Sequence, residues 1–345
     1  MSYVGRERPG VYSNYEASSI VWGNPIGKTV GLVAKSSADA GTLYNITSVS
    51  DAYSIFGNNE LISKLCETIL QNGAVKVAVV SAGSNNYDVA LKKIETLDDI
   101  CVVVCDSEDK EIHGKLKNSV VSASKNLKER IGIVSYPEDE YTTTLGKYFN
   151  CERIIVIAQS PVDLSGNAIS SCFLAAALAG ILSQTIDPTV SFNGKELNSI
   201  MGLTENLTEN KVDEYIQAGI TPFETVLDQT EVIRAVTSKT TTDDNSDTTF
   251  KDVNTILVVD YVILGLRNVL TNLLSGAKNN SSTREAISTQ VTIELEKYKS
   301  QNIIDGYDQP QITQDKDDPS VCIVEVKFEV SHGMNQIYIT ANVRV

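Results

Sequence analysis

Residues 100–134 read ICVVVCDSEDKEIHGKLKNSVVSASKNLKERIGIV. This stretch begins and ends with short apolar runs, Ile100–Cys105 and Ile131–Val134, and the residues between them, from about Lys110 to Glu129, have the spacing of a helix. A third apolar run of the same kind, Arg153–Ala158, follows. Strands that are apolar throughout and alternate with helices are typical of a mostly parallel sheet with helices on its faces. We therefore predict an α/β module in this part of the chain.

The segment before this module is predicted to form a smaller unit. Thr29–Ala34 alternates as a strand does, Val75–Val80 is a second and more apolar strand, and two helical stretches lie between them. Residues 2–16 are polar, with a Pro-Gly pair ahead of Val11, and have too little apolar periodicity to build an element alone. We therefore expect an extended arm at the N-terminus.

The C-terminal part predicts two helices followed by two half-buried strands. The first helix has an apolar stripe that begins at Val259, while Asp260 and Arg267 lie on its polar face. Val321–Val330 and Gln336–Val345 then alternate between apolar and polar residues, as strands with one buried face do. The second strand runs to the last residue given, and its backbone groups need a partner because unpaired buried groups are costly. A strand of another chain is one candidate for that partner.

Charge and composition argue against several classes of function. The net charge is −15 and no long basic run appears, so direct binding to nucleic acid is not expected. The apolar stretch Cys172–Leu182 is shorter than the roughly 20 residues that cross a bilayer, so no membrane insertion is expected. The N-terminal residues lack the apolar core of a secretory signal. The six cysteines form no CxxC pair and are expected to be free, buried thiols.

The sequence contains only fragments of catalytic and ligand-binding motifs. Gly23–Thr29 ends in Gly-Lys-Thr, but Trp22 stands where a phosphate-binding loop needs glycine, and a strand is predicted where the motif needs a helix. The two histidines, His113 and His332, are expected at the surface. Paired acids such as Asp98–Asp99 lie in polar loop sequence, where both should stay ionised. We therefore predict no catalytic residue, no cofactor and no metal ligand.

At separated places the residues resemble one known family, the contractile tail sheath proteins of phages and phage-tail-like bacteriocins. The N-terminal PGVY is similar to the family's opening arm, and the later matches follow in the family's order. They are Gly27–Ala34, Val49–Gly57, the AAALAG helix at Ala175–Gly180, Arg234–Thr237 with Thr240–Phe250, Asp260–Leu270, and the closing strand Ile337–Val343. Together they extend over most of the chain, and the region 100–221 matches least well. The length is similar to that of the smaller, Gram-positive type of sheath.

The resemblance implies a multidomain fold, mixed α/β and α+β, with extended arms that link neighbouring subunits. It implies five segments: an N-terminal linking arm at 1–20, the first part of the sheath core at 21–98, an α/β outer domain at 99–225, a C-terminal core domain at 226–332 and a linking strand at 333–345. The residues expected to make the links are Pro9, Gly10, Val11, Tyr12 and Tyr15 of the arm, Ile337, Tyr338, Ile339, Ala341, Val343 and Val345 of the linking strand, and Val324, Val326 and Phe328 of a receiving strand.

The partners that the resemblance implies are other proteins of one particle. They are further copies of the chain in stacked six-fold rings, an inner tail tube protein, the baseplate and the tail terminator. Such a particle is assembled in the bacterial cytoplasm and becomes part of a phage tail or a released tail-like particle. The sheath would polymerise around the tube and contract to drive it through a target cell envelope, with no hydrolysis in the sheath subunit.

Two other readings of the sequence remain. A cytosolic α/β enzyme would place a pocket at the strand ends near Asp106, Ser135 or Gln159, because ligands of such folds bind at the carboxyl edge of the sheet. Another polymerising shell or tube protein would share the unpaired terminal strands without being contractile. A deep pocket would favour the first of these, and electron micrographs of the particle would separate the second from a sheath.

Overall fold

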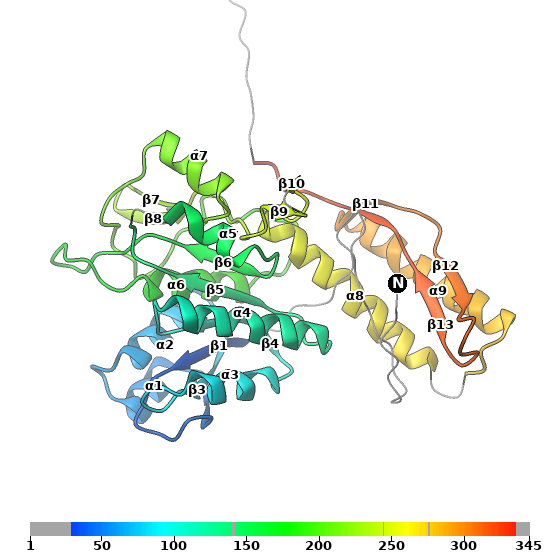
Figure 1. The fold of residues 1–345 in the computed structure, drawn as a ribbon, viewed down its shortest axis with the longest axis horizontal. Helices are drawn as coiled ribbons and strands as arrows, with labels where there is room; N and C mark the ends of the chain where they lie inside the picture. The colour runs from blue at the N-terminus through cyan, green and yellow to red at the C-terminus, as the bar shows by residue number, and fades with distance from the viewer. Residues whose placement is uncertain (1–28, 140–141, 244, 275–276, 336–345) are drawn as a thin grey trace, which may run out of the picture.

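The computed structural model describes residues 29–139, 142–243, 245–274 and 277–335, and its centre is a six-stranded sheet (Figure 1). The strand order is β2-β3-β1-β4-β5-β6, and every neighbouring pair is parallel except β2 with β3. The strands are β1 Thr29–Ala34, β2 Leu43–Ile46, β3 Lys76–Ser81, β4 Ile100–Cys105, β5 Ile131–Ser135 and β6 Ile154–Ile157. The predicted α/β fold is confirmed, and β1 is a strand where a phosphate-binding loop would need a helix.

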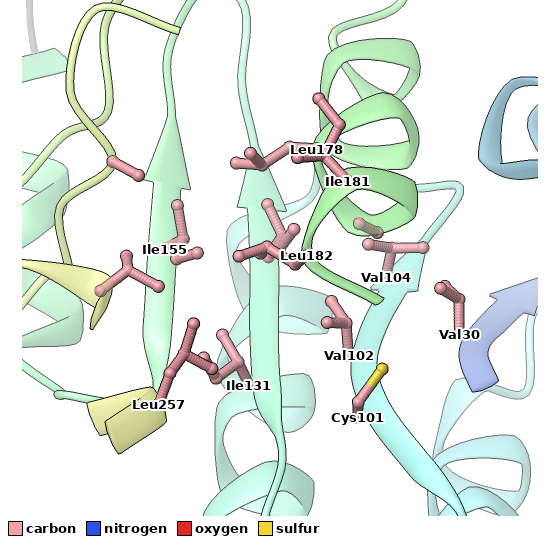
Figure 2. Close-up of a cluster of buried hydrophobic side chains, with 14 of the residues drawn as sticks. Val30, Cys101, Val102, Val104, Ile131, Ile155, Leu178, Ile181, Leu182 and Leu257 are labelled. Atoms are coloured by element: carbon pink, nitrogen blue, oxygen red, sulfur yellow. The ribbon is translucent and has the colours of Figure 1, made fainter. Parts of the chain in front are cut away.

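Helices cover both faces of the sheet, which is why its strands are apolar on both sides. Val30 and Leu32 face one buried cluster, which includes residues of α2 and α6, while Val33 faces the other, which includes residues of α3, α4 and α5. These helices are α1 Val49–Phe56, α2 Leu61–Gln71, α3 Tyr87–Glu95, α4 Lys110–Lys125, α5 Leu145–Phe149 after a 3-10 turn at Thr142–Thr144, and α6 Cys172–Ser183. Figure 2 shows Leu178 and Leu182 of α6 lying against Val102, Ile131 and Ile155 of three strands.

The sheet extends across the border expected between residues 98 and 99. β1 pairs with β3 on one side and with β4 on the other, so strands from both sides of that border hydrogen-bond to one another. The segments 21–98 and 99–225 therefore contribute to one sheet and share its two buried clusters.

Small residues let α6 approach α2 closely. A Cβ atom at Gly180 would lie 2.5 Å from the carbonyl oxygen of Ile69 and 2.7 Å from the Cβ of Asn72, distances that real Cβ atoms do not show. This close approach gives a physical reason for the glycine in the AAALAG helix, since any side chain there would push the two helices apart.

Beyond α6 the chain forms a helix and a hairpin before the C-terminal helices. These elements are α7 Glu209–Gln217, β7 Phe223–Val226 and β8 Gln229–Val232, followed by the short pair β9 Thr241–Thr242 and β10 Asn245–Ser246. The residues that follow β8, 233–237, are mostly irregular. The hydroxyl of Thr221 accepts the N–H of Val236 at 3.0 Å and donates to its carbonyl at 3.1 Å, so a side chain satisfies backbone groups that a neighbouring strand would otherwise pair.

The C-terminal unit consists of two long helices and a bent two-stranded ribbon (Figure 1). Its elements are α8 Val253–Leu274, α9 Ser281–Ser300, β11 Ile304–Tyr307, β12 Gln311–Gln314, β13 Cys322–Glu325 and β14 Phe328–Val330. Of the described helices, α8 is long and apolar enough over Val253–Thr271 to cross a membrane, yet 67% of that stretch is buried inside the protein. Because α8 lies between the sheet and α9, it is a core helix.

The strand predicted at Val321–Val330 is interrupted. β13 pairs with β12 and β14 pairs with β11, but three residues, 308–310, stand opposite only two, Val326 and Lys327. Pro310 has no N–H to donate to the ladder, and the extra residue forms a bulge. The single predicted strand is therefore two short strands of one bent ribbon.

Candidate functional site

The carboxyl edge of the sheet, where α/β proteins bind ligands, is occupied by the chain's own side chains. The parallel strands run in the order β3-β1-β4-β5-β6, so the chain changes direction between β1 and β4, the usual place for a ligand. There the Asp106 carboxylate accepts the backbone N–H of Lys35 at 2.8 Å and the hydroxyl of Tyr87 at 2.5 Å. Ser135 is buried, and Gln159 is buried with its amide bonded in both directions to the backbone of Phe223. These three residues thus serve the packing of the fold.

The ionisable residues give no cluster suited to a metal in the described part of the chain, where no group of three His, Cys, Asp or Glu residues comes together. The six cysteines are free; five are buried and Cys322 is half-buried. His332 is exposed as predicted. The prediction for His113 is wrong: it is 1% exposed, because it lies on the inward face of α4, edge-on to Tyr136 at 4.8 Å between ring centroids.

Burial of His113 predicts a loss of stability in acid. Desolvation lowers the pKa of His113 from 6.5 to about 4. Between about pH 6.5 and about pH 4, His113 is protonated in the unfolded chain but neutral in the folded protein. The free energy of unfolding should therefore fall as pH drops through this range, and His113 should account for roughly 2–3 kcal/mol of the loss. Urea unfolding of the unchanged protein and of the His113→Phe variant, each at pH 7 and at pH 4.5, measures this loss of stability.

The two proteins share every other titrating group, so the difference between them isolates His113. We expect a smaller loss in the phenylalanine variant between the two pH values. An equal loss in both would mean that His113 is charged or hydrated in the folded state.

The ribbon has unpaired edges. In the described residues β11 and β14 form one two-stranded sheet and β12 and β13 another, and no third strand joins either. The N–H of Asp315 donates to the carbonyl of Val321, and the N–H of Asp308 donates to the carbonyl of Lys327. The odd-numbered residues from 321 to 327 therefore direct their backbone N–H and C=O groups toward the partner strand. In an antiparallel ladder the residues between them point to the opposite edge. The backbone N–H and C=O groups of Val324 and Phe328 therefore face outward along a free edge.

The side chains of the predicted receiving residues point away from that edge. Val326 and Phe328 are buried in the cluster that contains α8 and α9 residues, and Val324 is partly buried against it. Another strand could therefore pair with the backbone of this strand, while the buried side chains hold the strand in place. The predicted arm residues Pro9, Gly10, Val11, Tyr12 and Tyr15 and the linking strand from Ile337 to Val345 lie outside the described residues.

The described start of the predicted linking segment, residues 333–335, is fixed to the body. The amide of Asn335 contacts Asp252 at 3.4 Å, and its side-chain oxygen accepts the amide of Asn193 at 2.9 Å. Asp252 is also held by Arg234 through two bonds of 2.8 and 3.0 Å. A Cβ at Gly333 would lie 3.1 Å from the carbonyl oxygen of Thr189, a tighter contact than most Cβ atoms make. Residues 333–335 are therefore held close to the body.

Two largely buried ion pairs join α8 to residues just before β5 and β6. Arg153, at the start of β6, contacts both carboxylate oxygens of Asp260 at 2.6 and 2.7 Å, and Arg267 contacts Glu129 at 2.7 Å. Asp260 and Arg267 were predicted on a polar face, and the structure shows both buried, because that face packs on the sheet. Burial raises the pKa of Asp260 to about 6, against the opposing effect of Arg153, so the carboxylate is ionised at neutral pH.

Two stretches of the chain match models of known protein families. Residues 81–238 match the model of the phage tail sheath protein central domain, and residues 245–344 match that of the phage tail sheath C-terminal domain. The two ranges together cover about three quarters of the chain. The chain belongs to the phage tail sheath family. It is a structural subunit of a contractile tail sheath, and the reading as an α/β enzyme is not favoured.

Solved structures show the same fold. The sheath tail protein of Desulfitobacterium hafniense has a TM-score of 0.71 at 12% identity, over 97% of this chain and 100% of that one. The helical sheath of the anti-feeding prophage in its contracted state has 0.73 at 14%, over 99% of both chains. The sheath tail protein of Listeria innocua has 0.71 at 12%, over 92% of this chain and 93% of that one. No protein in the curated collection matches the chain.

Sequence reasoning missed the ion pairs that fix α8 in the sheath subunit. Asp260 and Arg267 are seven residues apart on one helix, so they lie on the same side, and their opposite charges could have predicted an opposing pair on a packed neighbour. Arg153 offered a further signal, because it opens a strand that is otherwise apolar. Periodicity could not identify Arg153 as the partner of Asp260, because the two residues are 107 positions apart in the sequence.

Proposed function

We propose that this sheath subunit polymerises by adding strands of neighbouring copies to the free edge of its ribbon. The observation that carries the proposal is the outer edge of β13 and β14, whose backbone groups have no strand partner in the described residues. The arm that contains Pro9 to Tyr15 and the linking strand from Ile337 to Val345 are the proposed donors. An added strand would pair with the outward N–H and C=O groups of Val324, Val326 and Phe328.

Many weak links would make this lattice strong. Each backbone hydrogen bond contributes roughly 1 kcal/mol net, so one strand of a few residues gives a modest attachment that can form and rearrange during assembly. Edge strands left open are otherwise an aggregation hazard. Pairing the edge within stacked six-fold rings would satisfy these groups and fix the register between subunits.

Contraction would proceed by movement of whole subunits. The buried cluster that contains Val30 of the sheet also contains Leu295 of α9 and Phe328 of the ribbon, so the described parts share one core. The contacts of Asn335 with Asp252 and Asn193 support a hinge in the linking strand beyond that residue. Subunits would tilt and move outward while their strands stay paired.

The inner tube would contact α9. Of the two C-terminal helices, α8 is enclosed between the sheet and α9, whereas α9 buries only Val291, Leu295 and Tyr298 and exposes its opposite side, including Ile293. The anti-feeding prophage sheath to which this chain is similar is described as helical and contracted, and a related structure as a baseplate. By analogy, the partners of this chain would be a tube, a baseplate and a terminator, in a particle assembled in the cytoplasm. The subunit would need neither catalysis nor a cofactor.

Two variants test strand addition. Deletion of residues 1–16 should leave a folded protein that no longer forms long polymers. Val324→Pro removes one outward N–H without touching the bonds to β12, and should weaken polymer formation, whereas Val324→Thr keeps the N–H and should assemble normally. Sedimentation velocity and negative-stain images give the polymer length, and circular dichroism checks the fold. Normal polymers from both the truncated chain and the proline variant would contradict the proposal.

A further inference from the structure

Two exposed apolar side chains, Val75 and Ile186, lie near the amino edge of the sheet and are here called the edge patch. Val75 is 66% exposed and Ile186 is 85% exposed. Each comes two residues after the point where the ends of α2 and α6 meet. There the side-chain amide of Gln184 donates to the carbonyl of Asn72 at 3.3 Å, and a Cβ at Gly73 would lie 2.5 Å from Oε1 of Gln184. The two helix ends are therefore held together, and the edge patch begins where they meet.

The N-terminal part of the chain joins the sheet beside the edge patch. Thr29, the first residue described, pairs with Lys76 of β3 on one side and with Ile100 of β4 on the other. Val75, one residue before Lys76, therefore lies next to the point where the preceding chain enters. On the β4 side, the carboxylate of Asp99 accepts hydrogen bonds from the hydroxyl of Thr29 at 2.9 Å and from the ammonium group of Lys76 at 3.1 Å. The entry point is thus polar toward β4 and apolar toward Val75.

The sequence just before the entry point is apolar. Residues 20–26, which lie outside the described residues, read IVWGNPI, and four of the seven have large apolar side chains: Ile20, Val21, Trp22 and Ile26. Trp22 is seven residues from Thr29 and Ile26 is three. An extended chain can carry Trp22 at most about 25 Å from the entry point, so both side chains are tied to the neighbourhood of the edge patch. Burying such side chains is favourable because it removes apolar surface from water.

We propose that residues 20–26 dock on the edge patch of their own subunit, with Trp22 and Ile26 covering Val75 and Ile186. Because the segment is joined to Thr29 beside the patch, its effective concentration there far exceeds that of a second copy or of another protein in dilute solution. Docking covers the apolar segment and the apolar patch together. It would fix the base of the N-terminal arm to the body, and it does not depend on strand addition by that arm.

Tryptophan fluorescence tests the docking directly, because Trp22 is the only tryptophan in the chain. The measurement uses the full chain, diluted until sedimentation shows single subunits. We expect an emission maximum at shorter wavelength than that of the urea-unfolded chain. We also expect weak quenching by acrylamide, a neutral quencher that the net charge of −15 does not repel.

Substitution of the edge patch should expose Trp22. Val75→Asp combined with Ile186→Asp should move the emission maximum toward that of the unfolded chain and raise the quenching constant several-fold. Each single substitution should give part of that change. Both side chains are exposed in the described structure, so the buried core stays intact, and circular dichroism checks the fold.

Two controls separate docking from other effects. Leu164→Asp combined with Leu227→Asp adds the same charge at exposed apolar positions in the loops after β6, and should leave emission and quenching unchanged. The chain without residues 1–16 keeps residues 20–26, so its tryptophan signal should equal that of the full chain whether or not it polymerises.

The proposal is overturned if Trp22 is as accessible in the unchanged subunit as in the unfolded chain, or if the folded edge-patch variants keep the original signal. Protection of Trp22 that appears only as the protein concentration rises would also overturn it, and would assign the segment to a second copy. Failure of the strand-addition variants would leave the tryptophan signal unchanged.

Discussion

Asp260→Ala is expected to lower the free energy of unfolding of the sheath subunit by about 3–5 kcal/mol. The substitution leaves the guanidinium of Arg153 buried at the start of β6 without the carboxylate that it contacts at 2.6 and 2.7 Å. An unpaired buried charge is far more costly than the loss of an exposed pair. Urea unfolding followed by circular dichroism measures the change at neutral pH, where Asp260 is ionised.

Two controls separate the buried charge from the ion pair as such. Asp88→Ala breaks the exposed Lys115–Asp88 pair at 2.9 Å and should cost less than about 1 kcal/mol. Arg153→Met combined with Asp260→Leu removes both charges and should recover most of the stability, since apolar replacements of buried pairs are often neutral. A loss in Asp260→Ala no larger than that in Asp88→Ala would show that water reaches Arg153 in the folded protein.

Gly180→Ala is expected to destabilise the subunit by about 3 kcal/mol, at the upper end of the usual cost of overpacking. The added methyl group would meet the carbonyl oxygen of Ile69 at 2.5 Å, and a backbone atom cannot rotate away as a side chain can. α6 would have to move off α2, and with it Leu178 and Leu182 off the sheet (Figure 2). Thermal and urea unfolding would both show the loss.

The same substitution in α4 is its matched control. At Gly114 the nearest atom to an added Cβ is the hydroxyl of Tyr148 at 3.6 Å, an ordinary contact. Gly114→Ala should therefore stabilise the subunit by about 0.5–1 kcal/mol through helix propensity. If both variants lost stability alike, the cost at Gly180 would not come from the contact with α2.

The parts of the fold that could be predicted are those with a local signal. The apolar runs at Ile100–Cys105 and Ile131–Val134 identified buried parallel strands because both of their faces are covered. One strand of the ribbon, Val321–Val330, was predicted from alternation, but its partner strand and the bulge were not, because the break depends on Pro310 opposite Val326–Lys327. His113 was misplaced because a single polar residue in a helix gives no sign of its face. The partner of Asp260 was missed because it lies on another element.

The β7–β8 hairpin shows what periodicity cannot supply. Glu196, Glu224 and Glu231 are separated in the sequence, and only the register of the hairpin and its bridge to Glu196 place them side by side. The free ribbon edge is a similar case. The sequence indicated strands that need partners, and the backbone hydrogen bonds decided which groups face outward.

The shared core of the subunit has a mechanical consequence. Phe328 of the ribbon, Leu295 of α9 and Val30 of the sheet belong to one buried cluster. A tensile load applied to the ribbon is therefore transmitted to the sheet through packed side chains and not through a linker alone. The body should then behave as a stiff block, and extension should concentrate in the segments between blocks. Under a pulling force those segments should yield first and recover when the force is released, while the blocks keep their shape.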